Sequence, residues 1–399
     1  MNAPRPAGRF PALDGLRALA ALAVVLTHVG FSTSRSVQPD LVGAIIARGD
    51  FGVTVFFLLS GFLLYRPFAL HAFGLTRRPH VPEYLWRRAL RILPAMWLTV
   101  TITLAFVTTF RVRAEDWLHY LLLIQTYDHH DYDPNLSQLW TLVVEVSFYA
   151  LLPLLARAVG GPGRGPDAVL RRQLVMIAGL FAVGLAFNLL VSYTALTNSQ
   201  ALLWLPAYVD WFGAGMALAA LSCLPAGTRA LPMLRSAMQT CAQNRGTTWL
   251  LAGVLFFLAT LPIGIPRTLA PATFWEWTTQ HYVYLAAAFL LMLPFVLKPG
   301  GVPDDVLGSA PGRLFGNLSY SIYLWHVPVM LWLQRHLGYR QFHGHFLPLL
   351  GVTLPVTVAI AAASWFLVER PVLRYGSRPW RGAQEAASTP AASAAMQSS

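Results

Sequence analysis

The chemistry that this chain can perform is concentrated in its first hydrophobic segment, Pro11–Phe31, which holds an arginine and a histidine that a membrane helix normally excludes. Arg17 and His28 are eleven positions apart, so on an α-helix they face nearly the same direction, with a rise of about 16 Å between them. Ala21 and Val24 lie on the same stripe. This arrangement indicates a site for a long ligand. It has a charge near one end, a titratable imidazole near the other, and small side chains between them.

The elements that must position these residues are membrane helices. The chain has 399 residues, is 56% hydrophobic and 12% charged, and has a mean hydropathy of +0.52, whereas soluble domains are about 25% charged. We therefore expect an all-α, polytopic transmembrane bundle that forms one domain over residues 1–375, followed by a disordered cytoplasmic tail at 376–399. The two cysteines indicate neither a disulfide nor a metal site.

Ten hydrophobic segments are each close to the roughly 20 residues that a helix needs to cross a bilayer. They are Pro11–Phe31, Phe51–Leu70, Leu90–Phe110, Gln138–Ala156, Leu174–Val191, Ala201–Leu221, Thr248–Ile265, Tyr282–Leu297, Leu314–Leu333 and Phe346–Val368. Trp117–Tyr127 is also apolar, but its shortness favours an interfacial or re-entrant position.

The basic residues predict how these segments are oriented. With the N-terminus in the cytoplasm, 22 of the 29 Lys and Arg residues fall in inside segments and 7 fall outside. Both termini are therefore predicted to be cytoplasmic, in a multi-pass protein of the cytoplasmic membrane. These loops account for the net charge of +12, and no basic run interleaved with aromatic residues indicates nucleic-acid binding.

This orientation predicts two levels of polar groups inside the bundle. Three arginines, Arg17, Arg88 and Arg91, are expected near the inner face. Four titratable residues from four helices are expected to share one level in the outer half: His28, Glu145, Asp210 and His326. The outer group would then lie out of reach of a ligand head held by the arginines.

Arg88 and Arg91 stand one turn apart in Tyr84–Trp97, YLWRRALRILPAMW, where two guanidinium groups can grip phosphate. The alternative is an arginine-rich helix start that follows the positive-inside rule. Other helices carry polar residues in two segments: Glu145 and Tyr149 in Leu139–Leu155, LWTLVVEVSFYALLPLL, and Ser319 and His326 in Gly316–Pro328, GNLSYSIYLWHVP.

Two patterns that suggest other chemistry have simpler interpretations. Ser60–Gly61, within Gly52–Leu64, favours close helix packing over a nucleophile, because no Gly-x-Ser-x-Gly elbow surrounds it. A cluster in an outside loop fits neither a metal site nor a His-x-x-x-Asp signature, so a solvated acidic loop is favoured over acceptor binding: His129, His130, Asp131 and Asp133.

Together these segments resemble the integral-membrane acyltransferase-3 family, from Phe10 to about Arg374. The matching parts are the arginine and histidine of the first helix, Gly52–Leu64, Arg88 with Arg91 and Pro94, Trp140 to Tyr149, Gly316–Pro328 and Glu369-Arg370-Pro371. Three parts depart from the family pattern: Thr54 and Val146 stand where acids are common, and an arginine often found upstream of Asp210 is absent.

The resemblance implies transfer of an acyl group, often acetyl, from cytoplasmic acyl-CoA to a hydroxyl on the outer side. Acyl-CoA is then a donor substrate, and no cofactor is tightly bound. Typical acceptors of the family are sugars of lipopolysaccharide, exopolysaccharide, glycolipid or peptidoglycan, and macrolide antibiotics. The implied roles are catalysis by His28 and Glu145, phosphate binding by Arg17, Arg88 and Arg91, and substrate binding by Tyr149, Asp210, Ser319 and His326.

In this interpretation the pantetheine arm, about as long as the offset between Arg17 and His28, lies along the stripe at Ala21. His28 is the best general base, because an imidazole pKa lies near working pH. Glu145 would orient His28 or hold the sugar, unless it is a buried structural hydrogen-bond acceptor. His326 is either a participant in the reaction or a structural residue whose hydrogen bonds are satisfied. An acyl-histidine intermediate stays open.

Two other classes of function compete with this interpretation. Buried charges at mid-depth also mark transport sites, but the chain has no repeated hydrophobic pattern or paired Gly/Pro-broken helices in matching halves. A structural or sensor membrane protein would not need so many matching enzyme motifs.

Overall fold

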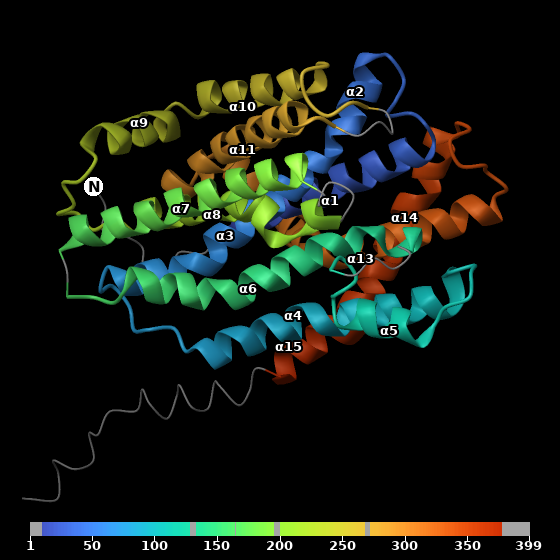
Figure 1. The fold of residues 1–399 in the computed structure, drawn as a ribbon, viewed down its shortest axis with the longest axis horizontal. Coiled ribbons are helices and arrows are strands. Elements are labelled where there is room, and N and C mark those ends of the chain that lie inside the picture. The colour runs from blue at the N-terminus through green and yellow to red at the C-terminus, as the bar shows by residue number, and fades with distance from the viewer. Residues whose placement is uncertain (1–9, 128–132, 164, 195–199, 268–271, 377–399) are drawn as a thin grey trace, which may run out of the picture.

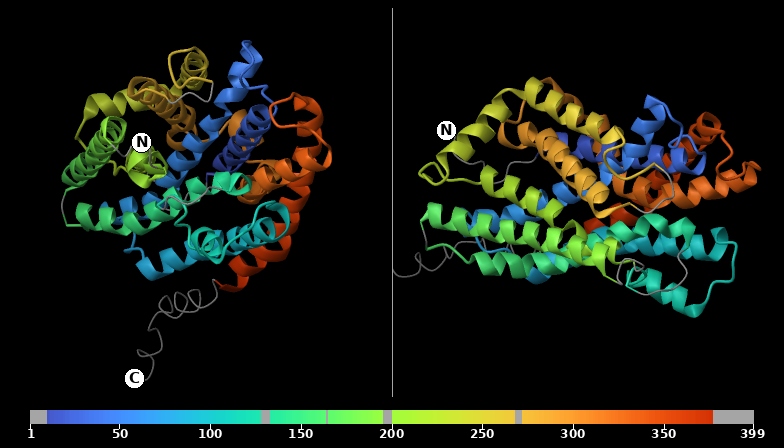
Figure 2. Two further views of the ribbon diagram at one scale, coloured as in Figure 1. Left: turned by 45° about the vertical axis from the view of Figure 1, so that its right-hand side comes forward. Right: turned by 45° about the horizontal axis from the view of Figure 1, so that its top comes forward.

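The structure, a computed structural model, describes residues 10–127, 133–163, 165–194, 200–267 and 272–376, and within these ranges it consists of helices without a strand (Figure 1). The long helices lie side by side along the longest axis (Figures 1 and 2). They are α1 (Pro11–Ser32), α3 (Phe51–Ala72), α4 (Val81–Ile102), α6 (Trp140–Val159), α7 (Pro166–Tyr193), α8 (Val209–Ser222), α10 (Arg245–Thr260), α11 (Phe274–Leu297), α13 (Ala310–His336) and α14 (Phe346–Ser364). The predicted all-α membrane bundle is confirmed.

The shorter helices connect or extend the long ones. They are α2 (Leu41–Ala47), α5 (Ala114–Leu121), α9 (Pro232–Gln243), α12 (Val302–Leu307) and α15 (Arg370–Gly376), which continues α14 through a π-helical turn at Trp365–Glu369. The apolar stretch Trp117–Tyr127 contains the second half of α5, an eight-residue helix that is too short to cross a bilayer.

Seven helices in the described ranges are long and apolar enough to cross a membrane. They are Pro11–Ser32, Leu41–Ala72, Val81–Val107, Pro134–Val159, Pro166–Tyr193, Phe274–Leu297 and Phe346–Gly376. The other three predicted spans fall on α8, which has 14 residues because 3₁₀ turns precede it, on α10, which has 16, and on α13, which has 27 and is rich in polar residues. The count of ten crossings and the cytoplasmic location of both termini stay predictions.

The centre of the bundle depends on a close crossing between α3 and α8. A methyl group on Gly61 would lie 2.2 Å from the carbonyl oxygen of Phe212, and one on Gly215 would lie 2.0 Å from that of Leu58. Only glycine lets the two backbones approach so closely. The packing role predicted for Ser60–Gly61 is therefore right for Gly61.

Asp133 was expected in a solvated loop, and this expectation is wrong. Its side chain is buried and accepts hydrogen bonds from Thr108 Oγ1, at 2.5 Å, and from the backbone N–H of Asn135, at 2.8 Å. The Asp133 N–H donates to the hydroxyl of Tyr120. Asp133 thus caps the 3₁₀ turn Pro134–Leu139 that leads into α6, where unpaired N–H groups need an acceptor. The neighbouring His129, His130 and Asp131, and the tail beyond residue 376, lie outside the described ranges.

Gly215→Ala should destabilise the protein by about 1–3 kcal/mol, because the new methyl group overlaps the Leu58 carbonyl and forces α3 and α8 apart. Thermal unfolding of the purified protein in detergent measures the change. Gly253→Ala, in α10, is the control, because a methyl group there meets nothing within 4 Å. Equal unfolding temperatures for the Gly215 variant and the native protein would contradict the close crossing.

Candidate active site

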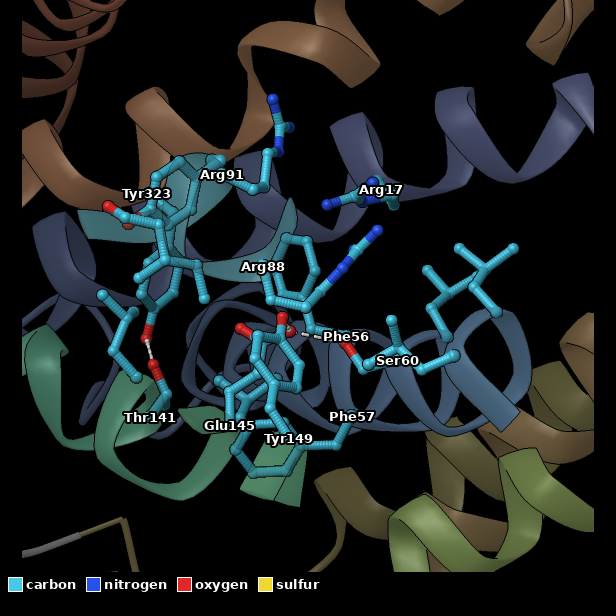
Figure 3. A pocket seen from close by; sticks show the side chains of 17 residues that line it. Arg17, Phe56, Phe57, Ser60, Arg88, Arg91, Thr141, Glu145, Tyr149 and Tyr323 are labelled. Carbon is cyan, nitrogen blue, oxygen red and sulfur yellow. Dashed lines mark hydrogen bonds between the residues drawn. The ribbon is translucent and has the colours of Figure 1, made fainter. Parts of the chain in front are cut away.

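A cavity opens between α1, α3, α4, α6 and α13, and we call it the arginine cavity (Figure 3). Its volume is about 810 Å³ when the open space at its mouth is included. The lining includes Arg17 of α1, Val53, Phe56, Ser60 and Leu64 of α3, Arg88 and Arg91 of α4, Glu145 and Tyr149 of α6, and Tyr320 and Tyr323 of α13. The structure thus brings the three predicted phosphate-binding arginines together.

The three arginines differ in how they are neutralised. Arg91 Nη1 lies 3.8 Å from the buried carboxylate of Glu369, and its guanidinium lies over the rings of Tyr320 and Trp365. No hydrogen bond or ion pair within the described ranges neutralises Arg17, and none neutralises its neighbour Arg88. Both guanidinium groups are half-buried and line the cavity, so they favour an anion there.

Glu145 is held on one side only. Ser60 Oγ donates to its Oε1 at 2.6 Å, and the Tyr149 hydroxyl donates to the same oxygen at 2.7 Å. Oε2 has no hydrogen bond within the described ranges, so it remains available to a ligand in the cavity. Both contacts come from residues of the lining, which keeps the carboxylate aimed into the open space (Figure 3).

The expected separation of Glu145 from the arginines is wrong. Arg17, Arg88 and Glu145 line one cavity, and Figure 3 shows the Arg88 side chain lying beside Glu145 and Tyr149. Depth counted along straight helices locates only the Cα atoms, whereas the long arginine side chain reaches one or two helical turns from its own backbone.

His28 and His326 form a contact that we call the histidine pair. His326 Nε2 lies 3.3 Å from His28 Nδ1, and the two ring centroids are 4.8 Å apart. His28 Nδ1 also lies 2.9 Å from the carbonyl oxygen of Val24, and His326 Nδ1 lies 2.6 Å from that of Tyr323. A carbonyl can only accept, so each Nδ1 carries the hydrogen in the neutral rings. His326 Nε2 then accepts from His28. His28 Nε2 has no hydrogen bond within the described ranges, and its lone pair can take a proton.

The histidine pair adjoins the arginine cavity through Tyr323. That tyrosine lines the cavity, its ring centroid lies 5.6 Å from that of His326, and its hydroxyl lies 2.7 Å from Thr141 Oγ1. The pair itself is not part of the cavity lining. A ligand that fills the cavity would therefore reach His28 past Tyr323.

The route predicted for the pantetheine arm, along the stripe of small side chains on α1, is wrong. Ala21 and Val24 are almost fully buried, in contact with α13 and its neighbours, because small side chains let α1 and α13 pack closely. The cavity instead follows α3 from Leu64 to Val53. Eleven residues separate these two, a rise of roughly 16 Å, which is the length that was expected along α1.

The expected group of four titratable residues at one level does not form. His28 and His326 touch, Glu145 lies in the arginine cavity, and Asp210 lies elsewhere, where both its oxygens are 2.9 Å from His281 Nε2. Positions along separate helices do not determine how those helices pack laterally.

The predicted substrate-binding residues are likewise dispersed. Tyr149 lines the arginine cavity, but Ser319 is buried and donates to Gly316 O in its own helix at 2.8 Å, which leaves it no access to that cavity. The roles predicted for the site residues stay predictions.

Two buried residues of these clusters are not among the site residues predicted from the sequence. Glu369 was noted as part of a motif without a role, although it is the carboxylate beside Arg91. His281 was missed because the predicted span began one residue later, at Tyr282, whereas α11 begins at Phe274. A histidine next to an apolar run was the signal that could have found it.

Comparison with known proteins decides the family. The profile of the acyltransferase domain of the acyltransferase-3 family matches residues 10–367. The chain belongs to this family. The resemblance found in the motifs is thereby confirmed.

Three curated relatives align with 92% of this chain. YrhL of Bacillus subtilis is 24% identical over 56% of its own length, the O-acetyltransferase OatA of Staphylococcus aureus is 20% identical over 58%, and the peptidoglycan O-acetyltransferase OatA of Listeria monocytogenes is 21% identical over 56%. The chain thus spans a little over half the length of these relatives. No solved structure matches.

Nitrogen-15 NMR of histidine-labelled protein should show the Nδ1–H form for both His28 and His326, because each Nδ1 faces a backbone carbonyl. Loss of single resonances in His28→Gln and His326→Gln variants assigns the signals among the 11 histidines. An Nε2–H form at His28 would contradict the free lone pair.

Proposed function

We propose that this protein is a membrane O-acyltransferase that moves an acyl group, most simply acetyl, from acyl-CoA to a hydroxyl of an envelope glycan, a glycolipid or a secreted metabolite. The observation that carries the proposal is the arginine cavity, which joins two uncompensated guanidinium groups to the neighbourhood of the histidine pair. Membership of the family and the names of the relatives support it.

The donor fits the cavity by charge and by length. The anionic nucleotide end of CoA would meet Arg17, Arg88 and Arg91, since guanidinium groups bind phosphate with paired N–H donors. The pantetheine arm would follow α3 toward Val53, past Glu145. Oε2 of Glu145 is open to accept a hydrogen bond from an amide N–H of that arm, which replaces the predicted role of orienting His28.

The histidine pair supplies the base in this proposal. His28 Nε2 takes the proton of the acceptor hydroxyl while the hydroxyl oxygen attacks the thioester carbonyl. The carbon–sulfur bond breaks, the ester forms, and the proton passes to the departing CoA thiolate. His326 Nε2 holds His28 Nδ1–H through both stages. Attack by His28 itself, with an acyl-histidine intermediate, uses the same Nε2.

The acceptor and the membrane follow from this assignment. With the predicted orientation, the arginines face the cytoplasm, where acyl-CoA is made, and the histidine pair lies toward the outer side. The enzyme would therefore act as a multi-pass protein of the cytoplasmic membrane on an acceptor presented from outside, such as a carbohydrate, a glycolipid or a macrolide.

Arg88→Ala should weaken CoA binding about ten- to a hundredfold, because a charge-assisted phosphate contact contributes roughly 1.5–3 kcal/mol. Arg91→Ala should weaken binding less, since Glu369 already engages that side chain. Calorimetry with CoA and dephospho-CoA on the purified protein measures the effect. Arg87→Ala is the matched control, because Arg87 is exposed and pairs with Glu83. Unchanged affinity in the Arg88 and Arg91 variants would place the donor elsewhere.

His28→Ala should lower acyl transfer by about 10²–10⁴-fold, the contribution of a general base, without weakening CoA binding. His326→Ala should have a smaller effect, because Val24 O still holds His28 Nδ1–H. Release of CoA thiol reports turnover. The control is His336→Ala, because His336 is an exposed histidine on α13, the helix of His326. Normal turnover by a folded His28 variant would overturn the assignment.

A further inference from the structure

A second cavity lies on another side of α3, between the start of that helix and α6, α8 and α11, and we call it the aromatic chamber. Its volume is about 450 Å³ when the open space at its mouth is included. Tryptophans from three helices form its walls: Trp140, Trp211 and Trp277. Val53 lines both the chamber and the arginine cavity, so the two spaces meet at a single side chain.

A buried acid–histidine dyad forms one wall of the chamber. His281 Nε2 lies 2.9 Å from both carboxylate oxygens of Asp210, and both residues are almost fully buried. The imidazole is stacked between two indoles, with ring centroids 4.5 Å from Trp211 and 4.3 Å from Trp277. Because a carboxylate accepts, Nε2 donates to Asp210, which fixes Nδ1 as the atom that remains for a further partner.

Two buried polar atoms of this wall have no partner within the described ranges. They are His281 Nδ1 and the indole N–H of Trp211, on side chains that are 3% and 6% exposed. Buried polar groups without a hydrogen bond are rare because desolvation is costly. His281 Nδ1 can accept a hydrogen bond and the Trp211 indole N–H can donate one. This combination suits a ligand that carries hydroxyl groups.

The charge of the chamber distinguishes it from the arginine cavity. Asp50 and Gln280 line it, Asp210 lies directly behind His281, and the described part of the lining holds no lysine or arginine. The nearby Arg48 donates to the backbone oxygens of Ala259 and Ile265 and also interacts electrostatically with Asp50 and Tyr284 of the lining. The two carboxylates of Asp50 and Asp210 outnumber this one arginine, so the surroundings disfavour an anionic ligand but not a neutral ring.

We propose that the aromatic chamber binds the acceptor as a neutral pyranose unit, with the Asp210–His281 dyad holding one of its hydroxyls through Nδ1. Indole faces pack against the C–H face of a sugar ring, while His281 Nδ1 accepts a hydrogen bond from one hydroxyl and the indole N–H of Trp211 donates to another. This inference rests on the proposed O-acyl transfer and makes it specific: uronic acids and phosphorylated sugars are excluded. Val53 is then the boundary between donor and acceptor.

Saturation-transfer NMR on the full chain in lipid nanodiscs tests the proposal, with maltotetraose and chitotetraose as neutral probes and tetragalacturonate as the anionic one. At least one neutral probe should bind and tetragalacturonate should not. Trp277→Ala and His281→Gln should each lower the affinity for the neutral probe at least tenfold. Trp275→Ala is the matched control, since Trp275 lies on the same helix with 70% of its surface exposed and should bind as the native protein does.

Calorimetric CoA binding by each variant is the folding control, because the arginine cavity shares only Val53 with the chamber. Absence of binding by both neutral probes, equal binding of tetragalacturonate, or native affinity in the Trp277 and His281 variants would overturn the chamber assignment. If the native protein does not bind CoA, the proposed donor site is overturned instead. The experiment therefore distinguishes failure of the donor site from failure of the chamber assignment.

Discussion

Guanidinium charge inside an apolar helical bundle is the constraint on which the rest of this structure depends. Such charges are expensive unless they are paired or face a polar cavity. Arg91 has the carboxylate of Glu369 and two aromatic rings, but Arg17 and Arg88 have no such partner in the described part of the chain. The bundle therefore keeps a cavity open around them, and the polar residues of α3, α4 and α6 gather on its walls.

The α3 helix divides the bundle into two chemically different spaces. One side of it lines the arginine cavity, and its first turns also reach the aromatic chamber, where carboxylates and indoles replace arginines. The division requires α3 to be held rigidly against α8, which the glycine contacts at Gly61 and Gly215 achieve. The arginine cavity and the aromatic chamber are thus separate spaces that share the side chain of Val53.

The histidine pair shows how local backbone geometry selects the tautomer of a histidine. The carbonyl oxygens of Val24 and Tyr323, each on the same helix as its histidine, determine which nitrogen of each ring carries the hydrogen. The contact between the rings joins α1 to α13, two segments almost 300 residues apart. Val24 O of α1 fixes the hydrogen on His28 Nδ1, and His326 Nε2 of α13 adds a second acceptor for the same hydrogen.

The sequence alone determined the helical membrane class and the family, and it identified Arg17, Arg88, Arg91 and Glu145 as site residues, because hydropathy and motif spacing are local properties. It did not reveal that Glu145 lies beside the arginines or that Ala21 is sealed in a helix contact, because linear depth contains no information on lateral packing. The pairing of Asp210 with His281, and the chamber around them, likewise depend on how α8 and α11 meet. Only the tertiary structure decides such contacts, since they join residues whose positions along the chain are independent.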